Sequence, residues 1–421
     1  MPGIQVRKKD RVLKGSVHLP SSKSISNRLL IIRALSPQDF PIDRLSDADD
    51  TLLLNELLRK IHEQKGLKSM TELDTANAGT VMRFLAAYLS TIPGKWILTG
   101  SDRMKKRPIG ILVDGLISLG AQIDYLATLG YPPVMIHGTA LKGKEIIVDP
   151  GISSQFVSAL LMIGPGIPGG LTLHLSGAAV SFPYVTMTIR LMKYFGVKVA
   201  EGRSRITVPE TKYIPAGYSV ESDWSAAAFW YEAAALSEEA DVFLEGLHKD
   251  SLQGDSIISE IFRTFNVFTE YTENGVRITK TKEPDRDQLL KYNFSDHPDI
   301  APPVITTCAV LGFQGSFSGL KSLQMKETER ITALKNEYEK LGIQAETLNT
   351  GNLISAIEIP ASGRQLPSGV RINSYGDHRM AMTFAPLAIR SGSIFIDDPE
   401  AVTKSYPGFW NDLVSLGFEI V

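Results

Sequence analysis

The stretch LVDGLISLGAQI, residues 112–123, contains the pattern that decides the fold. A helical run ends in a Leu-Gly step, and residues with strand character follow it. The same arrangement returns in four later stretches: IRLMKYFGVKV (189–199), SEIFRTFNVFT (259–269), KNEYEKLGIQA (335–345) and NDLVSLGFEI (411–420). Each helix is predicted to end at a residue that tolerates the left-handed conformation: Gly120, Gly196, Asn266, Gly342 or Gly417. The intervals between these ends are 76, 70, 76 and 75 residues, so one unit is predicted to repeat along the chain.

The repeat predicts the fold class. A strand is expected directly after each helix end, as at Val197–Val199 and Ile343–Ala345. A sixth, earlier copy is expected from Ser24 to Gly66. Six α/β units in 421 residues predict two pseudo-symmetric domains of three units each. The alternatives are a chance recurrence of Leu-Gly after helices, and an open solenoid.

Composition excludes several classes of protein. Lys and Arg number 44 against 46 Asp and Glu, and the formal net charge is -2. This balance argues against a protein that binds polyanions by bulk attraction. The single cysteine, Cys308, excludes an intramolecular disulfide framework and a Cys-rich zinc site.

No targeting or membrane segment is expected. The start, Met1–Gly15, lacks the apolar core of a signal peptide. Residues 150–189 carry no Asp, Glu, Lys or Arg, but glycines and prolines interrupt the middle of this stretch. The sequence therefore predicts a cytoplasmic protein.

Polar and basic clusters stand where helices are predicted to begin: PSSKSISNR (20–28), NAGTVMR (77–83), SSQ (153–155) and GDHR (376–379). Helix N-termini expose unpaired N–H groups and favour anions. The alternative is that each serine or asparagine only caps its helix, and that Lys326, Arg330 and Lys404 lie on a solvated, ion-paired surface. Repetition of the clusters favours a site for a small ligand with several negative charges.

The absence of three sequence motifs excludes three classes of protein. The sequence has no GxxxxGK[ST] loop, no GxGxxG at a strand–helix turn and no GxSxG elbow. P-loop phosphoryl transfer, Rossmann-type dinucleotide binding and α/β-hydrolase chemistry are therefore excluded.

Taken in order, the clusters resemble the 5-enolpyruvylshikimate-3-phosphate synthase family. The matching stretches run from residue 19 to 409: LPSSKSISNR, NAGTVMR, RMKKRPIG, SSQF, SFPY, HPDIAPP, MKETER, GDHRMAM and DDPEAVTKSYPGF. The resemblance implies two domains, each of three βαβαββ units, at residues 21–221 and at residues 1–20 with 222–421, and an active site in the interdomain cleft. It also implies transfer of the enolpyruvyl group of phosphoenolpyruvate to the 5-hydroxyl of shikimate 3-phosphate, with release of phosphate. A monomer without metal or cofactor is expected.

The resemblance also implies roles for individual residues. It assigns phosphoenolpyruvate binding to Lys23, Gly79, Arg107, Gln155, Arg330, Arg379 and Lys404. It assigns shikimate 3-phosphate binding to Lys23, Ser24, Arg28, Ser153, Ser154, Gln155, Ser181, Tyr184, Asp299 and Lys326. It assigns proton transfer to Asp299 and Glu327, with Lys23 assisting. Three positions depart from the family pattern: Phe84, Phe182 and Ser322.

Two rival functions remain open from the sequence. One is the sister enzyme that transfers enolpyruvate to UDP-N-acetylglucosamine, which usually relies on a loop cysteine. Here Cys308 stands in the apolar run VITTCAVLGF, where a buried structural cysteine is expected. The other rival is a non-catalytic repeat scaffold that binds an acidic partner. Such a scaffold has no need for Asp299 and Glu327 among its cations.

Overall fold

The computed structural model describes residues 3–64, 70–149, 151, 153–177, 181–202, 204–363 and 365–421. The chain forms two compact units, Met1–Ser22 with Glu221–Val421 and Lys23–Val220. We call the first the terminal unit and the second the middle unit. They differ from the predicted domains in the placement of Ser21, Ser22 and Glu221. The assignment of each unit to a transferase domain stays a prediction at this point.

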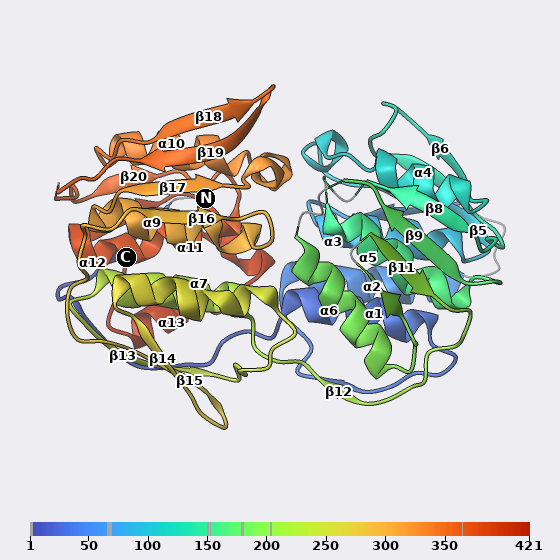
Figure 1. Cartoon of the computed structure of the whole chain (residues 1–421), viewed down its shortest axis with the longest axis horizontal. Helices are drawn as coiled ribbons and strands as arrows, with labels where there is room; N and C mark the ends of the chain where they lie inside the picture. The colour runs from blue at the N-terminus through green and yellow to red at the C-terminus, as the bar shows by residue number, and fades with distance from the viewer. Residues whose placement is uncertain are drawn as a thin grey trace. The chain divides into compact units, whose positions relative to one another are not determined.

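The middle unit combines three sheets with six α-helices among its described residues. Its strands are β3 (Ile42–Asp43), β4 (Met70–Asp74), β5 (Gly94–Thr99), β6 (Gln122–Tyr125), β7 (Val134–Gly138), β8 (Glu145–Val148), β9 (Leu171–Leu175), β10 (Ala200–Glu201), β11 (Arg205–Val208) and β12 (Tyr218–Ser219). Its helices are α1 (Lys23–Leu35), α2 (Asp49–Gln64), α3 (Gly79–Ser90), α4 (Gly110–Ser118), α5 (Ser154–Ile163) and α6 (Phe182–Tyr194), with short 3-10 turns η1 (Met104–Lys106) and η2 (Gly164–Gly166) (Figure 1). Helices α3 and α5 are buried along almost their whole length and pack together, whereas α2 and α6 bury one face.

The described residues of the terminal unit also form three sheets. Its strands are β1 (Ile4–Arg7), β2 (Val12–Val17), β13 (Glu239–Glu245), β14 (Phe268–Tyr271), β15 (Gly275–Lys280), β16 (Leu290–Asn293), β17 (Gly315–Ser318), β18 (Glu346–Thr350), β19 (Leu353–Ile359), β20 (Val370–Ile372), β21 (Ser393–Ile396) and β22 (Glu419–Ile420). Its helices are α7 (Trp224–Leu236), α8 (Ile258–Ile261), α9 (Ala301–Leu311), α10 (Arg330–Lys340), α11 (His378–Phe384), α12 (Ala388–Ser391) and α13 (Phe409–Ser415). The 3-10 turns are η3 (Gly254–Ile257), η4 (Phe262–Phe265), η5 (Pro298–Ile300), η6 (Lys321–Met325), η7 (Ala385–Leu387) and η8 (Pro399–Lys404).

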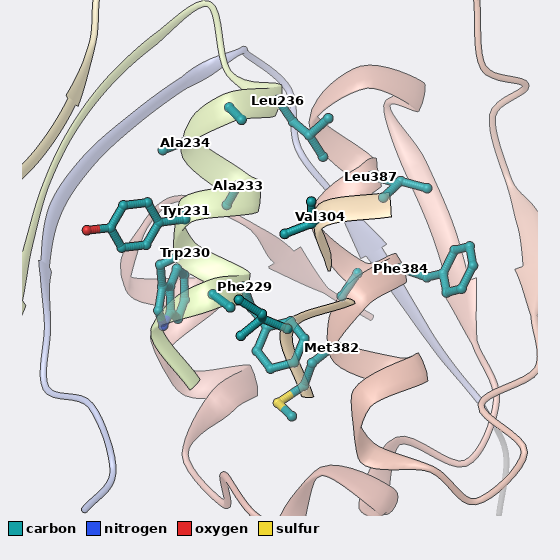
Figure 2. Packing of buried hydrophobic residues seen from close by; sticks show 14 of the residues in the cluster. Phe229, Trp230, Tyr231, Ala233, Ala234, Leu236, Val304, Met382, Phe384 and Leu387 are labelled. Atoms are coloured by element: carbon teal, nitrogen blue, oxygen red, sulfur yellow. The ribbon is translucent and has the colours of Figure 1, made fainter. Parts of the chain in front are cut away.

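The core of the terminal unit lies between α7, α9 and α11. Alanines on α7 leave little side-chain volume on parts of its surface, so neighbouring helices can approach closely. Figure 2 shows Phe229 of α7, Val304 of α9 and Met382 of α11 gathered in this core. All three side chains are buried.

Five of the six described sheets share one pairing pattern, which confirms the predicted repeat. In the sheet β4-β5-β7-β6, the first pair is parallel and the next two pairs are antiparallel. The orders β8-β9-β11-β10, β2-β13-β15-β14, β16-β17-β19-β18 and β20-β21-β1-β22 follow the same rule. The sixth sheet is the parallel pair β3 and β12. The fold is therefore mixed α/β with three sheets in each unit of the described chain.

The predicted helix ends are confirmed in detail. Gly120, Gly196, Asn266, Gly342 and Gly417 all have φ between 57° and 99°. At Gly196 the amide donates to the carbonyl of Lys193, and the next amide, of Val197, donates to Met192, at 3.0 Å each. These are the two bonds of the Schellman motif, and the other four ends repeat them. Gly66, the end of the predicted sixth copy, lies outside the described residues.

The predicted strand positions at Val197–Val199 and Ile343–Ala345 are wrong by a few residues. Strand β10 begins at Ala200 and β18 at Glu346. The reason is the Schellman turn, which uses the amide of the first apolar residue after the glycine to close the helix. Val197 and Ile343 are buried, as the sequence pattern predicts. Their amides complete the C-terminal turn of the helix, and strand pairing begins a few residues later.

The 150–189 stretch separates into α5, β9 and the start of α6 within its described part, as expected of a buried helix–strand unit. In the described chain, no helix combines the length and the apolar character needed to cross a membrane.

Candidate active site

Seven charged residues of the terminal unit meet where α9, α10 and α11 begin. We call them the terminal cluster: Asp299, Lys326, Glu327, Arg330, Asp377, Arg379 and Lys404. Asp299 belongs to η5, directly before α9, and Arg330 is the first residue of α10. Asp377 is the N-cap of α11 and accepts a 2.9 Å bond from the amide of Arg379. The repeat thus brings together residues that are far apart in sequence.

Arg330 is the centre of the terminal cluster. Its guanidinium is 1% exposed and reaches three carboxylates. Nε donates to Oδ2 of Asp377 at 2.8 Å, and one terminal nitrogen donates to Glu327 at 2.8 Å. The other terminal nitrogen lies 3.4 Å from Oδ1 of Asp299. Burial opposes the charge of Arg330, but the carboxylates of Asp377, Glu327 and Asp299 raise its pKa above the ordinary arginine value.

Asp299 is surrounded by cations. Lys326 Nζ lies 3.3 Å from its Oδ1, and a terminal nitrogen of Arg379 lies 3.1 Å from its Oδ2. Burial by itself would raise the pKa of Asp299, but the charges of Arg379, Lys326 and Arg330 bring the pKa well below its usual range. Asp299 is therefore ionised near neutral pH.

Glu327 has a cation near each oxygen. Arg330 donates to Oε2, and Lys404 Nζ lies 3.6 Å from Oε1. The side chains of Glu327 and Lys404 are 9% and 12% exposed. Two carboxylates, Asp299 and Glu327, thus share one guanidinium, and each has further cations beside it. The terminal cluster thus sets two candidate proton acceptors beside cations that can bind an anionic ligand.

A second cluster lies at the N-terminus of α3 in the middle unit. The guanidinium of Arg83 donates to the carbonyls of Gly79 at 3.0 Å and Pro108 at 3.1 Å. Arg107 donates to the carbonyl of Asn77 at 3.2 Å. A Cβ on Gly79 would lie 2.7 Å from an Arg83 nitrogen and closer still to Arg107, so a larger residue here would have to displace both guanidinium groups. The N-cap of α3 is Ala78, so Asn77 is not the cap.

Several of the polar residues assigned to shikimate 3-phosphate lie at the starts of α5 and α6. Ser153 is the N-cap of α5, and its hydroxyl accepts a 3.2 Å bond from the amide of Gln155. Ser153 therefore caps α5, and its contact with a ligand stays a prediction. The side-chain amide of Gln155 donates to the hydroxyl of Thr80 on α3 at 3.0 Å, which links the two helix starts. Ser181 is the N-cap of α6 in the left-handed conformation, and Ser154 is buried.

Arg28 lies in the interior of the middle unit. Its guanidinium donates to the hydroxyls of Thr188 at 2.7 Å and Ser158 at 3.4 Å, and to two backbone carbonyls. Those carbonyls belong to Ser24, at 2.8 Å, and to Tyr184, at 3.2 Å. Burial lowers the pKa of Arg28 to about 10. The described contacts connect α1 to α5 and α6, and a direct contact between Arg28 and a ligand stays a prediction.

The positions that depart from the family pattern have structural surroundings of their own. Phe84 is fully buried on α3, with the Arg28 guanidinium 5.4 Å from its ring centre. Phe182 is the first residue of α6, and Ser322 belongs to η6.

Three acidic residues that interact with assigned site residues were not themselves assigned from the sequence: Asp50, Asp255 and Asp377. Asp377 belongs to the quoted GDHRMAM stretch, and an aspartate two residues before a helical arginine is a readable N-cap signal. Asp50 contacts Lys23 at 3.1 Å across 27 positions, which no local pattern indicates. Asp255 of η3 is buried, and burial followed by the charge of Asp299 raises its pKa to about 6.

Cys308 is fully buried on α9, and its thiol faces the carbonyl of Phe313 at 3.7 Å. Burial raises the pKa of this thiol to about 12. It is therefore a structural residue, as expected, and not a reactive loop cysteine.

Comparisons with known proteins show which family the chain is similar to. The family model of EPSP synthase (3-phosphoshikimate 1-carboxyvinyltransferase) matches residues 7–413. The 3-phosphoshikimate 1-carboxyvinyltransferase of Bacteroides fragilis (strain YCH46) is 46% identical over 409 residues, which cover 97% of this chain and 96% of the relative. The protein of the same name from Sulfurovum sp. (strain NBC37-1) is 34% identical over 427 residues, with 96% and 97% covered.

A solved structure has the same fold. EPSP synthase from Acinetobacter baumannii superimposes with a TM-score of 0.76 at 24% identity, and the alignment covers 100% of both chains. The family model, which spans nearly all of the sequence, and the curated relatives establish that the chain belongs to the EPSP synthase family.

Proposed function

We propose that the terminal cluster and the second cluster, formed by Gly79, Arg83 and Arg107 of the middle unit, serve the enolpyruvyl transfer of this family. The chain is a transferase that moves the carboxyvinyl group of phosphoenolpyruvate to shikimate 3-phosphate, a step in aromatic amino-acid biosynthesis. We also infer that it works as a monomer in the cytoplasm. Light scattering on the purified chain tests whether it is a monomer, and cell fractionation tests whether it lies in the cytoplasm.

The phosphoenolpyruvate site is proposed from cations of both units. Arg330, Arg379 and Lys404 of the terminal unit, with Lys23 and Arg107 of the middle unit, would neutralise the phosphate and carboxylate. Gly79 would allow close approach of the ligand to the α3 N-terminus. Gln155 would contact both substrates.

The shikimate 3-phosphate site is proposed at the first turns of α1, α5 and α6. Hydroxyl, amide and cationic groups there would bind the phosphate and ring hydroxyls: Lys23, Ser24, Arg28, Ser153, Ser154, Gln155, Ser181 and Tyr184. Asp299 and Lys326 would complete the site from the terminal unit.

The chemistry follows addition and elimination. The 5-hydroxyl oxygen of shikimate 3-phosphate attacks C2 of phosphoenolpyruvate, its proton passes to a base, and C3 gains a proton to become a methyl group. In the second step C3 loses a proton, the bond between C2 and the phosphate oxygen breaks, and phosphate leaves. We assign these proton transfers to Asp299 and Glu327, with Lys23 assisting. The single observation that supports this assignment is that both carboxylates contact Arg330 and that each has at least one further cation beside it.

The experiment is a steady-state assay of phosphate release by Asp299→Asn and Glu327→Gln. Each variant is expected to lower kcat at least about 100-fold, the usual scale of a lost proton-transfer group. Glu329→Gln is the matched control, because Glu329 is exposed and stands two residues after Glu327. It should stay within about threefold of wild type. Wild-type kcat in both test variants would overturn the assignment.

A further inference from the structure

The ion pair between Lys23 and Asp50 lies within the middle unit. Lys23 is the first residue of α1, and Asp50 is the second residue of α2. Lys23 Nζ donates to Oδ2 of Asp50 at 3.1 Å, and the two side chains are 15% and 7% exposed. Because the pair is largely removed from water, screening by solvent is weaker than for a surface ion pair.

The dipoles of α1 and α2 favour the ion pair between Lys23 and Asp50. A lysine at the N-terminus of a helix faces the positive end of the helix dipole, which disfavours its charge. An aspartate in the first turn of a helix has the opposite, favourable relation to the dipole. The α2 N-terminus therefore supports the charge of Asp50, and Asp50 offsets the unfavourable field that α1 exerts on Lys23.

Neighbouring buried bonds fix the distance between the two helix starts. The hydroxyl of Thr51, next to Asp50, donates to Oδ1 of Asn27 at 2.8 Å, and Asn27 lies one turn after Lys23. The amide of Ser46 donates to the hydroxyl of Ser26 at 3.0 Å. All four residues are buried. These bonds hold the start of α2, and Asp50 with it, in place relative to the backbone of Lys23.

We propose that Asp50 is a positioning residue for the enolpyruvyl transfer, because it holds the ammonium group of Lys23 in its working geometry. This inference rests on the proposed role of Lys23. A lysine has a flexible four-carbon stem and three N–H donors. The bond to Asp50 restricts the conformations of this side chain, so the cation is oriented by the fold.

The test is a double-mutant cycle with Asp50→Asn and Lys23→Met, followed by kcat/KM and by the Kd of shikimate 3-phosphate. Asp50→Asn keeps the shape of the side chain and removes its charge. In the wild-type background it should lower kcat/KM about 10- to 100-fold, the equivalent of one charge-assisted hydrogen bond. In the Lys23→Met background the same substitution should change both quantities less than about threefold, because the group that Asp50 orients is gone.

Asp49→Asn is the matched control. Asp49 is the exposed neighbour in the same first turn of α2, so its loss removes the same charge from the helix end. The control should stay within about threefold of wild type. Equal losses from Asp50→Asn in both backgrounds, or a loss from Asp49→Asn as large as that from Asp50→Asn, would overturn the inference.

Two further arms separate the possible failures. If Lys23→Met alone keeps wild-type kcat/KM and Kd, the proposed role of Lys23 fails first, and the inference about Asp50 fails with it. Thermal unfolding of each variant shows whether the fold persists. If Asp50→Asn does not fold, Asp50→Glu, which keeps the charge but shifts the carboxylate by one methylene, goes through the same cycle under the same criteria.

Discussion

At the scale of single residues, burial decides which charges depend on their partners. Arg330 is buried with Asp377, whose side chain is fully enclosed. The surface pair of Arg371 and Asp397 has the same chemistry, but its side chains are 59% and 38% exposed. Water can replace a lost partner at the surface, whereas it has little access to Arg330.

Asp377→Asn is therefore expected to lower the free energy of unfolding by about 3–5 kcal/mol, because it leaves the buried guanidinium with less compensating charge. The surface control, Asp397→Asn, should cost less than about 1 kcal/mol. Urea unfolding of both variants at pH 7 measures the difference. Similar costs at the two sites would contradict this account of Arg330.

Glu232 is a buried acid outside both clusters. It lies on α7 with no exposed surface, and neither carboxyl oxygen has a hydrogen-bond partner among the described residues. Burial raises the pKa of Glu232 well above its ordinary value. The folded state therefore favours the protonated form, and its free energy of unfolding falls as pH rises above about 4.3, the unfolded pKa of glutamate.

Glu232→Met should remove this penalty. The variant is expected to be more stable than wild type at pH 8 by about 1–3 kcal/mol, and the gain should shrink as the pH is lowered to 5. Glu337 is the contrasting buried acid, because it accepts bonds from Tyr375 at 2.7 Å and Lys340 at 2.6 Å. Glu337→Met should lose stability. A gain for Glu232→Met that does not vary with pH would count against the sign of this pKa shift.

At the scale of elements, five helices end at a residue in the left-handed conformation, and these ends mark the repeated unit. A Cβ on Gly342 would meet no atom within 4 Å, whereas a Cβ on Gly196 would lie 2.8 Å from Cγ1 of Ile214. Gly342→Ala isolates the backbone cost, expected at about 1–2 kcal/mol. Gly196→Ala should cost more, because it adds a clash to the same backbone strain. Chemical unfolding of the two variants compares them, and equal costs would show that the contact with Ile214 relaxes freely.

The sequence predicted these elements unevenly. Glycine or asparagine at a helix end is a local signal, so all five ends were predicted to the residue. The strands after Gly196 and Gly342 were predicted too early, because a Schellman turn and a strand start both place an apolar residue directly after the glycine. Whether the apolar residue closes the helix or begins the strand depends on which carbonyl accepts the hydrogen bond of its amide. The periodicity of the sequence does not indicate this carbonyl.

At the scale of the whole molecule, the near-neutral total charge is compatible with a local excess of positive charge. The net charge is -2, yet the terminal cluster sets four cations against three carboxylates. Resemblance to a family predicted these cations, but not the partners Asp50 and Asp377. Such pairs join residues 27 and 47 positions apart through the packing of separate helices. The N-cap position of Asp377 is readable in the sequence, but its pairing with Arg330, like that of Asp50 with Lys23, follows from the tertiary structure alone.

The most direct test of the account is phosphate release from phosphoenolpyruvate by the purified chain. Wild type, Arg107→Met and Arg330→Met are each assayed with shikimate 3-phosphate or with UDP-N-acetylglucosamine as acceptor. We expect wild type to release phosphate with shikimate 3-phosphate alone. Each variant should lower kcat/KM at least about 100-fold, because it removes charge-assisted bonds. Release only with the nucleotide sugar, or wild-type kcat/KM in both variants, would contradict the account.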